Sequence, residues 1–412
     1  MNEHANQGVN KKQSLCQVRL KKLGVYPFER LKKLFSGHLA NPALTPIDAG
    51  AGEPRLPLPS FVADTLAEHL GGFSKYPSTI GGLPLRQTIA HWLERRFDLQ
   101  HVDPVTQVLS ANGTREALFA IAHALINPEA ENKPNVVMPN PMYQIYLGAA
   151  YTAGGEPVFL PCTEAAGFAP DLNALTDDVW RNTALVYVCS PSNPTGWIAD
   201  AAYFETLLAL ADEHDFYIVS DECYSEIYWQ DKPVGLLQVA ESLGRKGFHR
   251  CLVMNSLSKR SALPGMRSGL IAGDAELIAR FTKIRSYTGP GTPLPLQAVA
   301  AAAWSDETHV ERHLEVYRAS LKAFFEVYSD VADIPAGSFF VWLPVVDGEA
   351  FALAAYEQQA VTILPGSYLS VGDASADNAG GGNPGAGFIR AALVDGPEQA
   401  AELARRLKAV RV

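Results

Sequence analysis

The chain has 412 residues, 47% of them hydrophobic, which is enough for two or more domains with buried cores. Its formal net charge of −10 argues against a nucleic-acid-binding protein, because such proteins usually present a basic face. The five cysteines, without a C-x-x-C pair, are typical of buried thiols in a reducing compartment. The sequence contains no apolar run of membrane-spanning length, and the polar stretch Met1–Ser14 lacks the apolar core of a signal peptide. We therefore expect a cytoplasmic protein.

The middle of the chain alternates strand-like and helical patterns. Helices are predicted at Thr114–Ile126, Ala201–His214 and Ala275–Ser286. The strand-like runs are rich in Val, Ile, Leu and Tyr and show little polar alternation, so both faces of their sheet should be buried. They are Asn135–Pro139, Pro157–Leu160, Ala184–Cys189, Phe216–Ser220, Cys251–Asn255 and Gly269–Gly273. This order predicts an α/β domain with a mostly parallel sheet, whose ligand lies at the carboxyl ends of the strands.

The C-terminal part predicts a smaller α+β domain. A long helix is expected at Thr308–Tyr328, and its partners are expected at Ser338–Leu343, Val361–Leu364, Phe388–Leu393 and, as the last helix, Pro397–Val410. The loop Gly372–Gly387 is rich in Gly, Ala, Asp and Asn. The division we expect is a tail at 1–20, a segment at 21–55 that joins the small domain, a large domain at 56–305 and a small domain at 306–412.

One segment, residues 255–269, carries the chemistry of the large domain. Lys259 follows a predicted buried strand and stands among hydroxyls, and Arg267 comes eight residues later. A lysine amine forms a Schiff base with an aldehyde, and Ser256, Ser258 and Arg267 offer donors and a positive charge for a phosphate. A polar surface loop is the plainer interpretation of S-x-S-K alone. The continuation Pro-Gly-x-Arg-x-Gly favours the cofactor site.

Three further segments follow predicted strands. Asn112–Arg115 opens a helix, whose free amides suit a phosphate but are also those of an ordinary N-cap. Ser190–Gly196 by itself is a Pro-rich turn. Asp221–Tyr224 supplies an anion that either caps a helix or keeps a pyridine nitrogen protonated.

In this order, the four segments resemble the class I/II aminotransferases, which are fold type I enzymes that use pyridoxal 5'-phosphate. The resemblance extends from about Tyr26 to the C-terminus. It implies an α/β fold with a large domain and a smaller α+β domain, a transaminase activity on amino acids and 2-oxo acids, and a homodimer. It implies no membrane partner, no nucleic acid and no metal.

The resemblance also assigns roles around the cofactor ring. Lys259 would form the Schiff base and act as the general base, and Asp221 would pair with the pyridinium nitrogen. Tyr224 and Asn193 would bond the ring hydroxyl oxygen, and Tyr143 would stack on the ring. The resemblance implies that Lys259, Asp221 and Tyr224 are the catalytic residues.

Other roles concern the phosphate and the substrate. Arg390 would bind the substrate α-carboxylate, with help from Gly52 and Asn193. Tyr76 would reach the phosphate of the neighbouring subunit. The remaining cofactor contacts would be Gly113, Thr114, Arg115, Ser256, Ser258 and Arg267.

Within the family, the stretches YPFERL, NGTREALFA, PMYQIY, SLSKRSALPGMRSG and GNPGAGFIRAALV resemble the succinyldiaminopimelate transaminases of bacterial lysine biosynthesis. This implies N-succinyl-LL-2,6-diaminopimelate as amino donor and 2-oxoglutarate as acceptor, giving N-succinyl-2-amino-6-oxopimelate and glutamate. The distal carboxylates of this donor need a second set of donors. Arg30, Arg260 and the stretch Ser286–Thr292 are candidates.

Alternative functions remain at this point. The same scaffold serves aspartate, aromatic and N-acetylornithine aminotransferases and C–S lyases, and some regulators carry it behind a DNA-binding domain. The short tail disfavours the last of these. His309 and His313 lie four residues apart, but the sequence is H-V-E-R-H, so we expect an exposed helical face rather than a zinc site. The glycines at 380–387 lack the setting of a dinucleotide site.

Overall fold

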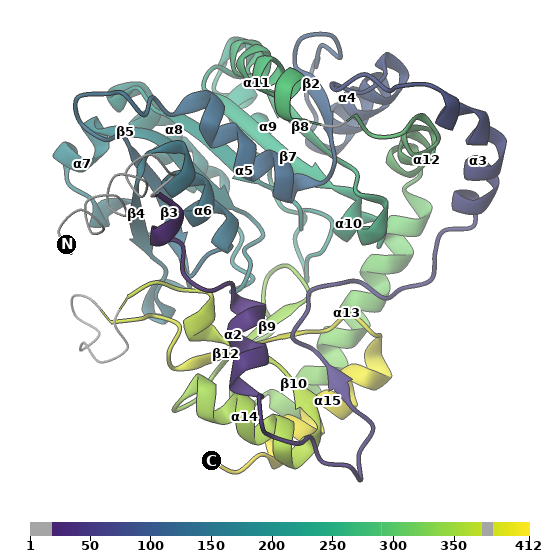
Figure 1. The fold of residues 1–412 in the computed structure, drawn as a ribbon, viewed down its shortest axis with the longest axis vertical. Helices are drawn as coiled ribbons and strands as arrows, with labels where there is room; N and C mark the ends of the chain where they lie inside the picture. The colour runs from purple at the N-terminus through teal and green to yellow at the C-terminus, as the bar shows by residue number, and fades with distance from the viewer. Residues whose placement is uncertain (1–18, 290, 373–381) are drawn as a thin grey trace, which may run out of the picture.

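The computed structural model describes residues 19–289, 291–372 and 382–412. Its large domain is built on a seven-stranded sheet of strand order β2-β8-β7-β6-β5-β3-β4 (Figure 1). The strands are β2 (Val108–Ala111), β3 (Asn135–Asn140), β4 (Glu156–Pro161), β5 (Thr183–Cys189), β6 (Tyr217–Asp221), β7 (Cys251–Ser256) and β8 (Gly269–Gly273). β8 runs antiparallel to both neighbours and the other pairs are parallel, which confirms the predicted mostly parallel sheet. Part of the predicted loop Gly372–Gly387 lies outside the described residues.

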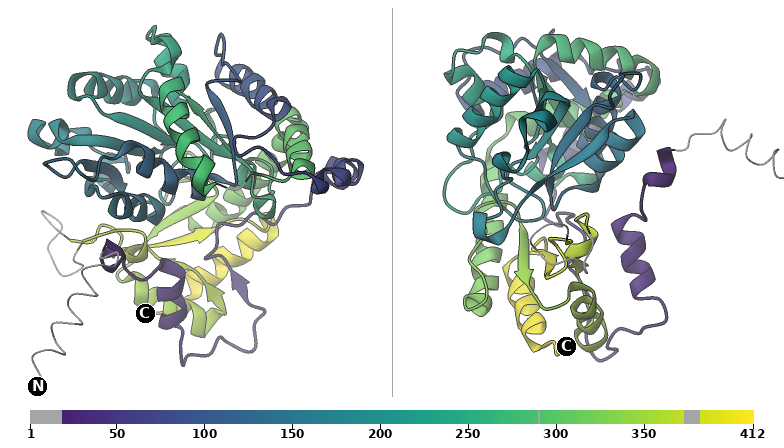
Figure 2. Two further views of the ribbon diagram at one scale, coloured as in Figure 1. Left: turned by 45° about the horizontal axis from the view of Figure 1, so that its top comes forward. Right: turned by 90° about the vertical axis from the view of Figure 1, so that its left-hand side faces the viewer.

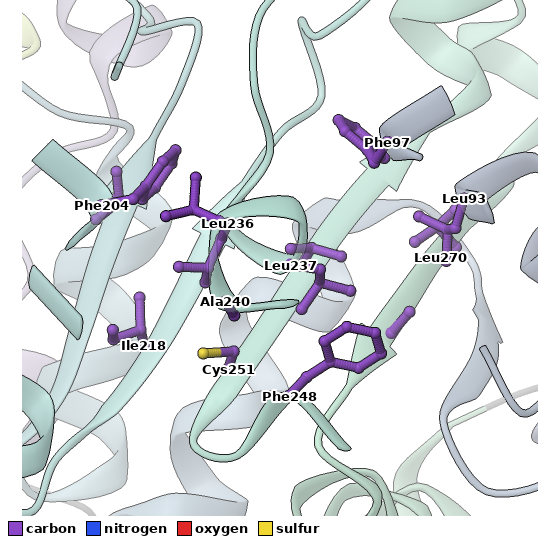
Figure 3. Close-up of a cluster of buried hydrophobic side chains, with 14 of the residues drawn as sticks. Leu93, Phe97, Phe204, Ile218, Leu236, Leu237, Ala240, Phe248, Cys251 and Leu270 are labelled. Carbon is purple, nitrogen blue, oxygen red and sulfur yellow. The ribbon is translucent and has the colours of Figure 1, made fainter. Parts of the chain in front are cut away.

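Two apolar cores lie on opposite faces of this sheet, and helices cover both faces (Figure 2). Along β3, Val137 belongs to one core, whereas Val136 and Met138 belong to the other. This alternation explains the continuous apolar runs of the strands. One face is covered by α5 (Thr114–Leu125), α6 (Gln144–Ala153) and α11 (Ala275–Thr288), and the other by α4 (Leu83–Phe97), α8 (Ala201–His214), α9 (Leu236–Ser242) and α12 (Leu294–Ser305). Figure 3 shows Leu236, Leu237 and Ala240 of α9 in the core on the face that α4, α8, α9 and α12 cover.

The small domain contains a three-stranded antiparallel sheet of order β11-β12-β9, formed by β9 (Phe340–Pro344), β11 (Leu364–Pro365) and β12 (Phe388–Ala392). Its helices are α13 (Thr308–Tyr328), α14 (Gly348–Gln359) and α15 (Pro397–Ala409). The predicted single strand Val361–Leu364 is two strands, because β10 (Val361–Thr362) pairs in parallel with β1 (Ile47–Asp48) and β11 pairs with β12. The domain limits themselves stay a prediction.

Shorter elements complete the described chain. The helices are α2 (Pro27–Leu34), α3 (Phe61–His69), α7 (Asp177–Arg181) and α10 (Leu257–Arg260). The 3-10 turns are η1 (Arg19–Lys22), η2 (Leu70–Ser74), η3 (Glu164–Ala166), η4 (Leu172–Ala174), η5 (Lys246–Phe248), η6 (Pro264–Met266) and η7 (Gly366–Tyr368). Among the described residues, we find no helix with the length and apolarity that crossing a membrane requires.

The prediction of an exposed face for His309 and His313 is wrong. Both side chains are buried, with exposed fractions of 5% and 8%. The helix α13 buries a wide face that also includes Val310, Leu314 and Tyr317, and the two histidines fall on it at helical spacing. The spacing of four positions from one histidine to the next therefore indicated only that they share a face, not that this face is exposed to water.

Candidate active site

A cavity of about 420 Å³ lies at the carboxyl ends of the central strands, beside the first turn of α5. Most of the predicted site residues line it, although they are far apart in the sequence. They are Gly52, Thr114, Arg115, Tyr143, Asn193, Asp221, Tyr224, Ser256, Ser258, Lys259, Arg267 and Arg390. Gly113 lies behind this wall against Arg267, and Tyr76 does not line the cavity.

One part of the cavity, the phosphate pocket, named for the group that its residues suit, is formed where β2 meets α5. Gly113 is the N-cap residue of α5 and has a φ of 84°, in the region that favours glycine. A Cβ atom there would lie 2.1 Å from Nη2 of Arg267, so the arginine packs where a side chain would be. Ser258 donates its backbone N–H to Oγ of Ser256 over 3.1 Å. These hydroxyls, the arginine and the helix N-terminus form a positive, donor-rich pocket that fits a phosphate.

Asp221 ends β6 and its side chain lies at the cavity wall, with only 4% of the residue exposed. Its Oδ2 accepts a hydrogen bond from the Tyr146 hydroxyl over 2.7 Å, and its Oδ1 accepts one from the Cys223 amide over 3.2 Å. Burial raises the pKa of this carboxyl, and the two donors oppose the rise. A protonated ring nitrogen in the cavity would therefore satisfy a buried anion.

Lys259 lies in α10, the short helix that follows β7, and its side chain reaches the cavity. Burial, together with the charges of Arg390 and Arg267, lowers the pKa of this lysine to about 8. Its Nζ donates a hydrogen bond to the carbonyl of Gly52. A Cβ atom on Gly52 would lie 2.4 Å from the Phe340 ring, so glycine is required there. A lowered pKa favours the free amine, which is the form that attacks an aldehyde.

Arg390, on β12, is a buried cation with an exposed fraction of 4%. It donates to Oδ1 of Asn193 over 2.8 Å and to the carbonyl of Gly50 over 2.7 Å, and its guanidinium lies 4.1 Å from the centre of the Phe340 ring. Its Nε has no partner, and none of the ion pairs formed by the described residues includes it. Burial lowers its pKa to about 10. A substrate carboxylate would pair with this charge and reduce the cost of burying it.

Arg115 holds two aromatic rings at the cavity. Its Nε donates to the Tyr143 hydroxyl over 2.9 Å and its Nη2 donates to the Tyr26 hydroxyl over 3.1 Å. Two of its donors thus position tyrosines at the cavity. Tyr224, which is buried and lines the cavity, packs edge-on against Phe340 at 5.7 Å between ring centres.

The structure does not bring every candidate into this cavity. Tyr76 is fully exposed, and Arg260 is buried elsewhere in an ion pair with Glu307. Within the stretch Ser286–Thr292, the Thr292 hydroxyl donates to Asn112, behind the phosphate pocket. Arg30 lies on the wall of an adjoining cavity.

Two residues of the site, Tyr146 and Phe340, were not predicted from the sequence. Tyr146 donates a hydrogen bond to Asp221. It lies three residues after Tyr143 at the start of α6, and this helical spacing could have indicated that both tyrosines face the site. Phe340 has no local pattern that reveals it, because it meets Gly52 and Arg390 only through the fold.

Comparison with known proteins agrees with this geometry. The sequence model of the family described as aminotransferase class I and II matches residues 45–407. An LL-diaminopimelate aminotransferase from Moorella thermoacetica is 30% identical over an alignment of 401 residues, and the alignment covers 95% of this chain and 97% of that protein. Among solved structures, an aminotransferase from Neisseria meningitidis is 39% identical, with a TM-score of 0.89 and coverage of 96% of this chain and 100% of that one. A probable N-succinyldiaminopimelate aminotransferase from Thermus thermophilus is 26% identical, with a TM-score of 0.78 and coverage of 92% and 97%.

The chain therefore belongs to the class I and II aminotransferases. It is a transaminase that depends on pyridoxal 5'-phosphate, as the resemblance of its motifs implied. When bound, this cofactor supplies an electron sink that allows a proton to leave the α-carbon of an amino acid.

Proposed function

We propose that the protein transfers the amino group of N-succinyl-LL-2,6-diaminopimelate to 2-oxoglutarate, in lysine biosynthesis. The observation that carries the proposal is the buried Arg390, which shares the catalytic cavity with Lys259. Both partners of this reaction have an α-carboxylate, and the bidentate geometry of an arginine suits that group. Lys259 moves the proton, Asp221 holds the ring nitrogen, and the serines and Arg267 hold the phosphate.

The length of the proposed donor is supported by a second cavity. Its volume is about 990 Å³, and it shares Tyr26, Pro27 and Gln144 with the catalytic cavity. Arg30 lies on its wall with the guanidinium 3.8 Å from the centre of the Tyr368 ring. A donor whose α-carboxylate is held by Arg390 has room there for its distal half, and a carboxylate at its far end would have a cation within this space.

LL-Diaminopimelate itself is a second candidate donor. The Moorella thermoacetica relative bears that substrate in its name, and the wall of the second cavity also contains Asp347 and Glu349. Glu349 pairs with Arg30 over 3.3 Å. These carboxylates suit the distal ammonium group of the unsuccinylated donor, whereas Arg30 suits the distal carboxylate of either donor.

A panel of amino donors with 2-oxoglutarate as acceptor tests the proposal. The kcat/KM for the succinylated donor should exceed that for LL-diaminopimelate, aspartate, phenylalanine and N-acetylornithine by orders of magnitude, because a site built for polar groups rejects ligands that leave them unpaired. A preference for LL-diaminopimelate selects the second candidate. A preference for aspartate or an aromatic donor refutes both candidates. Steady release of pyruvate and ammonia from a sulfur amino acid would mark a C–S lyase.

We also propose that the active unit is a homodimer in which Tyr76 completes the site of the neighbouring subunit. Tyr76 is fully exposed and follows Leu70 and Phe73, which are exposed by 52% and 58%. Large apolar side chains gathered on a surface are typical of an interface between subunits.

Hybrid dimers test this assembly. Mixing Tyr76→Phe protomers with Lys259→Ala protomers gives one site that keeps both residues only if Tyr76 acts across the interface. Activity above that of either parent is the expected result. Hybrids without recovered activity, or a fully active monomer in sedimentation, would contradict the proposal.

A further inference from the structure

The two residues after Lys259 fasten its turn to the start of α13. Arg260 is buried against the indole rings of Trp92 and Trp304, which also contact each other, and the ring centres lie 5.4 and 5.2 Å from its guanidinium carbon. It donates to the Ala303 carbonyl and to Oε1 of Glu307, each over 2.7 Å. Because only 1% of Arg260 is exposed, these bonds attach the backbone next to Lys259 firmly to the chain at 303–307.

Ser261 makes a second attachment through a chain of buried side chains. His309 lies between Oγ of Ser261, 2.8 Å from its Nε2, and Oδ2 of Asp306, 2.5 Å from its Nδ1. An ionised carboxylate only accepts, so Nδ1 carries the hydrogen and donates to Asp306. Burial lowers the pKa of His309, which favours the neutral ring, so the Ser261 hydroxyl donates to Nε2.

This serine–histidine–aspartate arrangement resembles that of hydrolases, but its position excludes that use. Ser261 is fully buried and is not among the residues that line the catalytic cavity, so no substrate reaches its hydroxyl. The arrangement instead lies between two elements of the transaminase. One is the turn that carries Lys259, and the other is the first turn of α13, since the His309 amide also donates to Asp306 over 3.0 Å.

Helix α13 connects the two halves of the active site. Figure 1 shows it running from the large domain into the small domain, where it lies beside α15. Lys259 belongs to the large domain, whereas Arg390 lies on β12 of the small domain. Whatever fixes α13 to the lysine turn also limits how the amine and the substrate-binding cation move relative to each other.

We propose that His309 is a positioning residue of the transamination reaction, which holds the Lys259 turn against α13 through Ser261 and Asp306. It acts on where the lysine amine stands and not on how tightly the substrate binds. The proposal does not depend on which amino donor is physiological, because every donor meets the same lysine.

The test uses the full-length cofactor-loaded protein with glutamate as the donor, in His309→Gln and Ser261→Ala variants. We expect kcat for the glutamate half-reaction to fall about ten- to a hundredfold in each variant with little change in KM, since small misplacements of a reacting group have effects of this size. The double variant should be no slower than the worse single variant, because both changes break the same chain. The pH at which the visible absorption of the bound cofactor changes should shift in both variants, since it reports the surroundings of the Lys259 nitrogen.

The matched control is Ser320→Ala. Like Ser261→Ala it removes the hydroxyl of a fully buried serine, but this serine lies within α13 and donates to the Val316 carbonyl of the same helix. It should keep the wild-type kcat and absorption. Losses of thermal stability alone, with kcat and absorption unchanged in Ser261→Ala, would overturn the proposal and leave a purely structural role. Additive effects of the two changes on kcat would also overturn it. If His309→Gln does not fold, Ser261→Ala alone gives the decisive measurement.

Discussion

Replacing Gly113 with alanine should separate the two demands that the structure makes of this residue. The first is conformational, because φ is 84° and ψ is 156°, a combination essentially restricted to glycine, in which another residue costs about 1–3 kcal/mol. The second is spatial, because the new Cβ atom would lie 2.1 Å from Nη2 of Arg267. The arginine must then leave its place, where it donates to the carbonyls of Pro264 and Asn112 over 2.9 and 3.2 Å.

Two measurements follow from these two demands. The free energy of unfolding of the cofactor-free protein, measured with urea, should fall by about 1–3 kcal/mol. Loss of a hydrogen bond between the cofactor phosphate and a charged group costs about 1.5–3 kcal/mol, so cofactor binding should weaken about ten- to a hundredfold in fluorescence titrations.

Gly265→Ala is the matched control, since a Cβ atom there meets no atom within 4 Å and the residue belongs to the same loop as Arg267. It should stay within about 0.5 kcal/mol of the wild type. If Gly113→Ala loses stability but binds the cofactor as the wild type does, Arg267 does not hold the phosphate and the reasoning fails.

Three further predictions concern the charged groups of the cavity. The pKa of Lys259 is about 8 in the folded protein and 10.5 ordinarily, so between these pH values the unfolded chain binds more protons than the folded one. The free energy of unfolding of the cofactor-free protein should therefore rise as the pH increases from 8 to 10.5. In urea unfolding experiments, Lys259→Met should lack this part of the increase. Tyr146→Phe removes a donor that opposes the rise in the pKa of Asp221, and should lower kcat by about tenfold without loss of fold; an unchanged kcat would show that the bond is dispensable. Arg390→Gln should lower kcat/KM for glutamate at least about thirtyfold, the effect of breaking a buried charge pair, and leave the cofactor absorption intact; a wild-type kcat/KM would place the carboxylate elsewhere.

Local patterns predicted the fold where the pattern had one physical cause. The strands of the central sheet are buried on both faces, and their apolar runs end within one or two residues of β3, β5, β6 and β7. The helix α13 begins and ends where its periodicity does. Helices such as α12 were not predicted, since its sequence, LPLQAVAAAAWS, is apolar on every side and has little periodicity.

The sequence predicted which residues of the site follow strands and therefore lie together, because parallel strands bring their carboxyl ends to one edge of the sheet. Asp221, Asn193 and Lys259 all line the cavity for that reason. The hydrogen bond between His309 and Ser261 was not predictable from the helix of His309, because Ser261 is 48 residues away. Contacts of this range arise from the packing of whole elements and leave no mark in a local pattern.

The stretch from Gly50 to Gly52 explains how Arg390 keeps its positive charge before a substrate enters the cavity. Its two glycine carbonyls accept hydrogen bonds from Arg390 and Lys259, and β1, just before it, is paired with β10 and so fixes its path. Backbone carbonyls satisfy donors without cancelling their charge, whereas a carboxylate in the same place would neutralise it. The side chain of Asn193, the third acceptor, is neutral as well. Arg390 thus keeps its attraction for an anionic amino acid, and an acidic residue at position 50 would remove it even if the fold accepted the side chain.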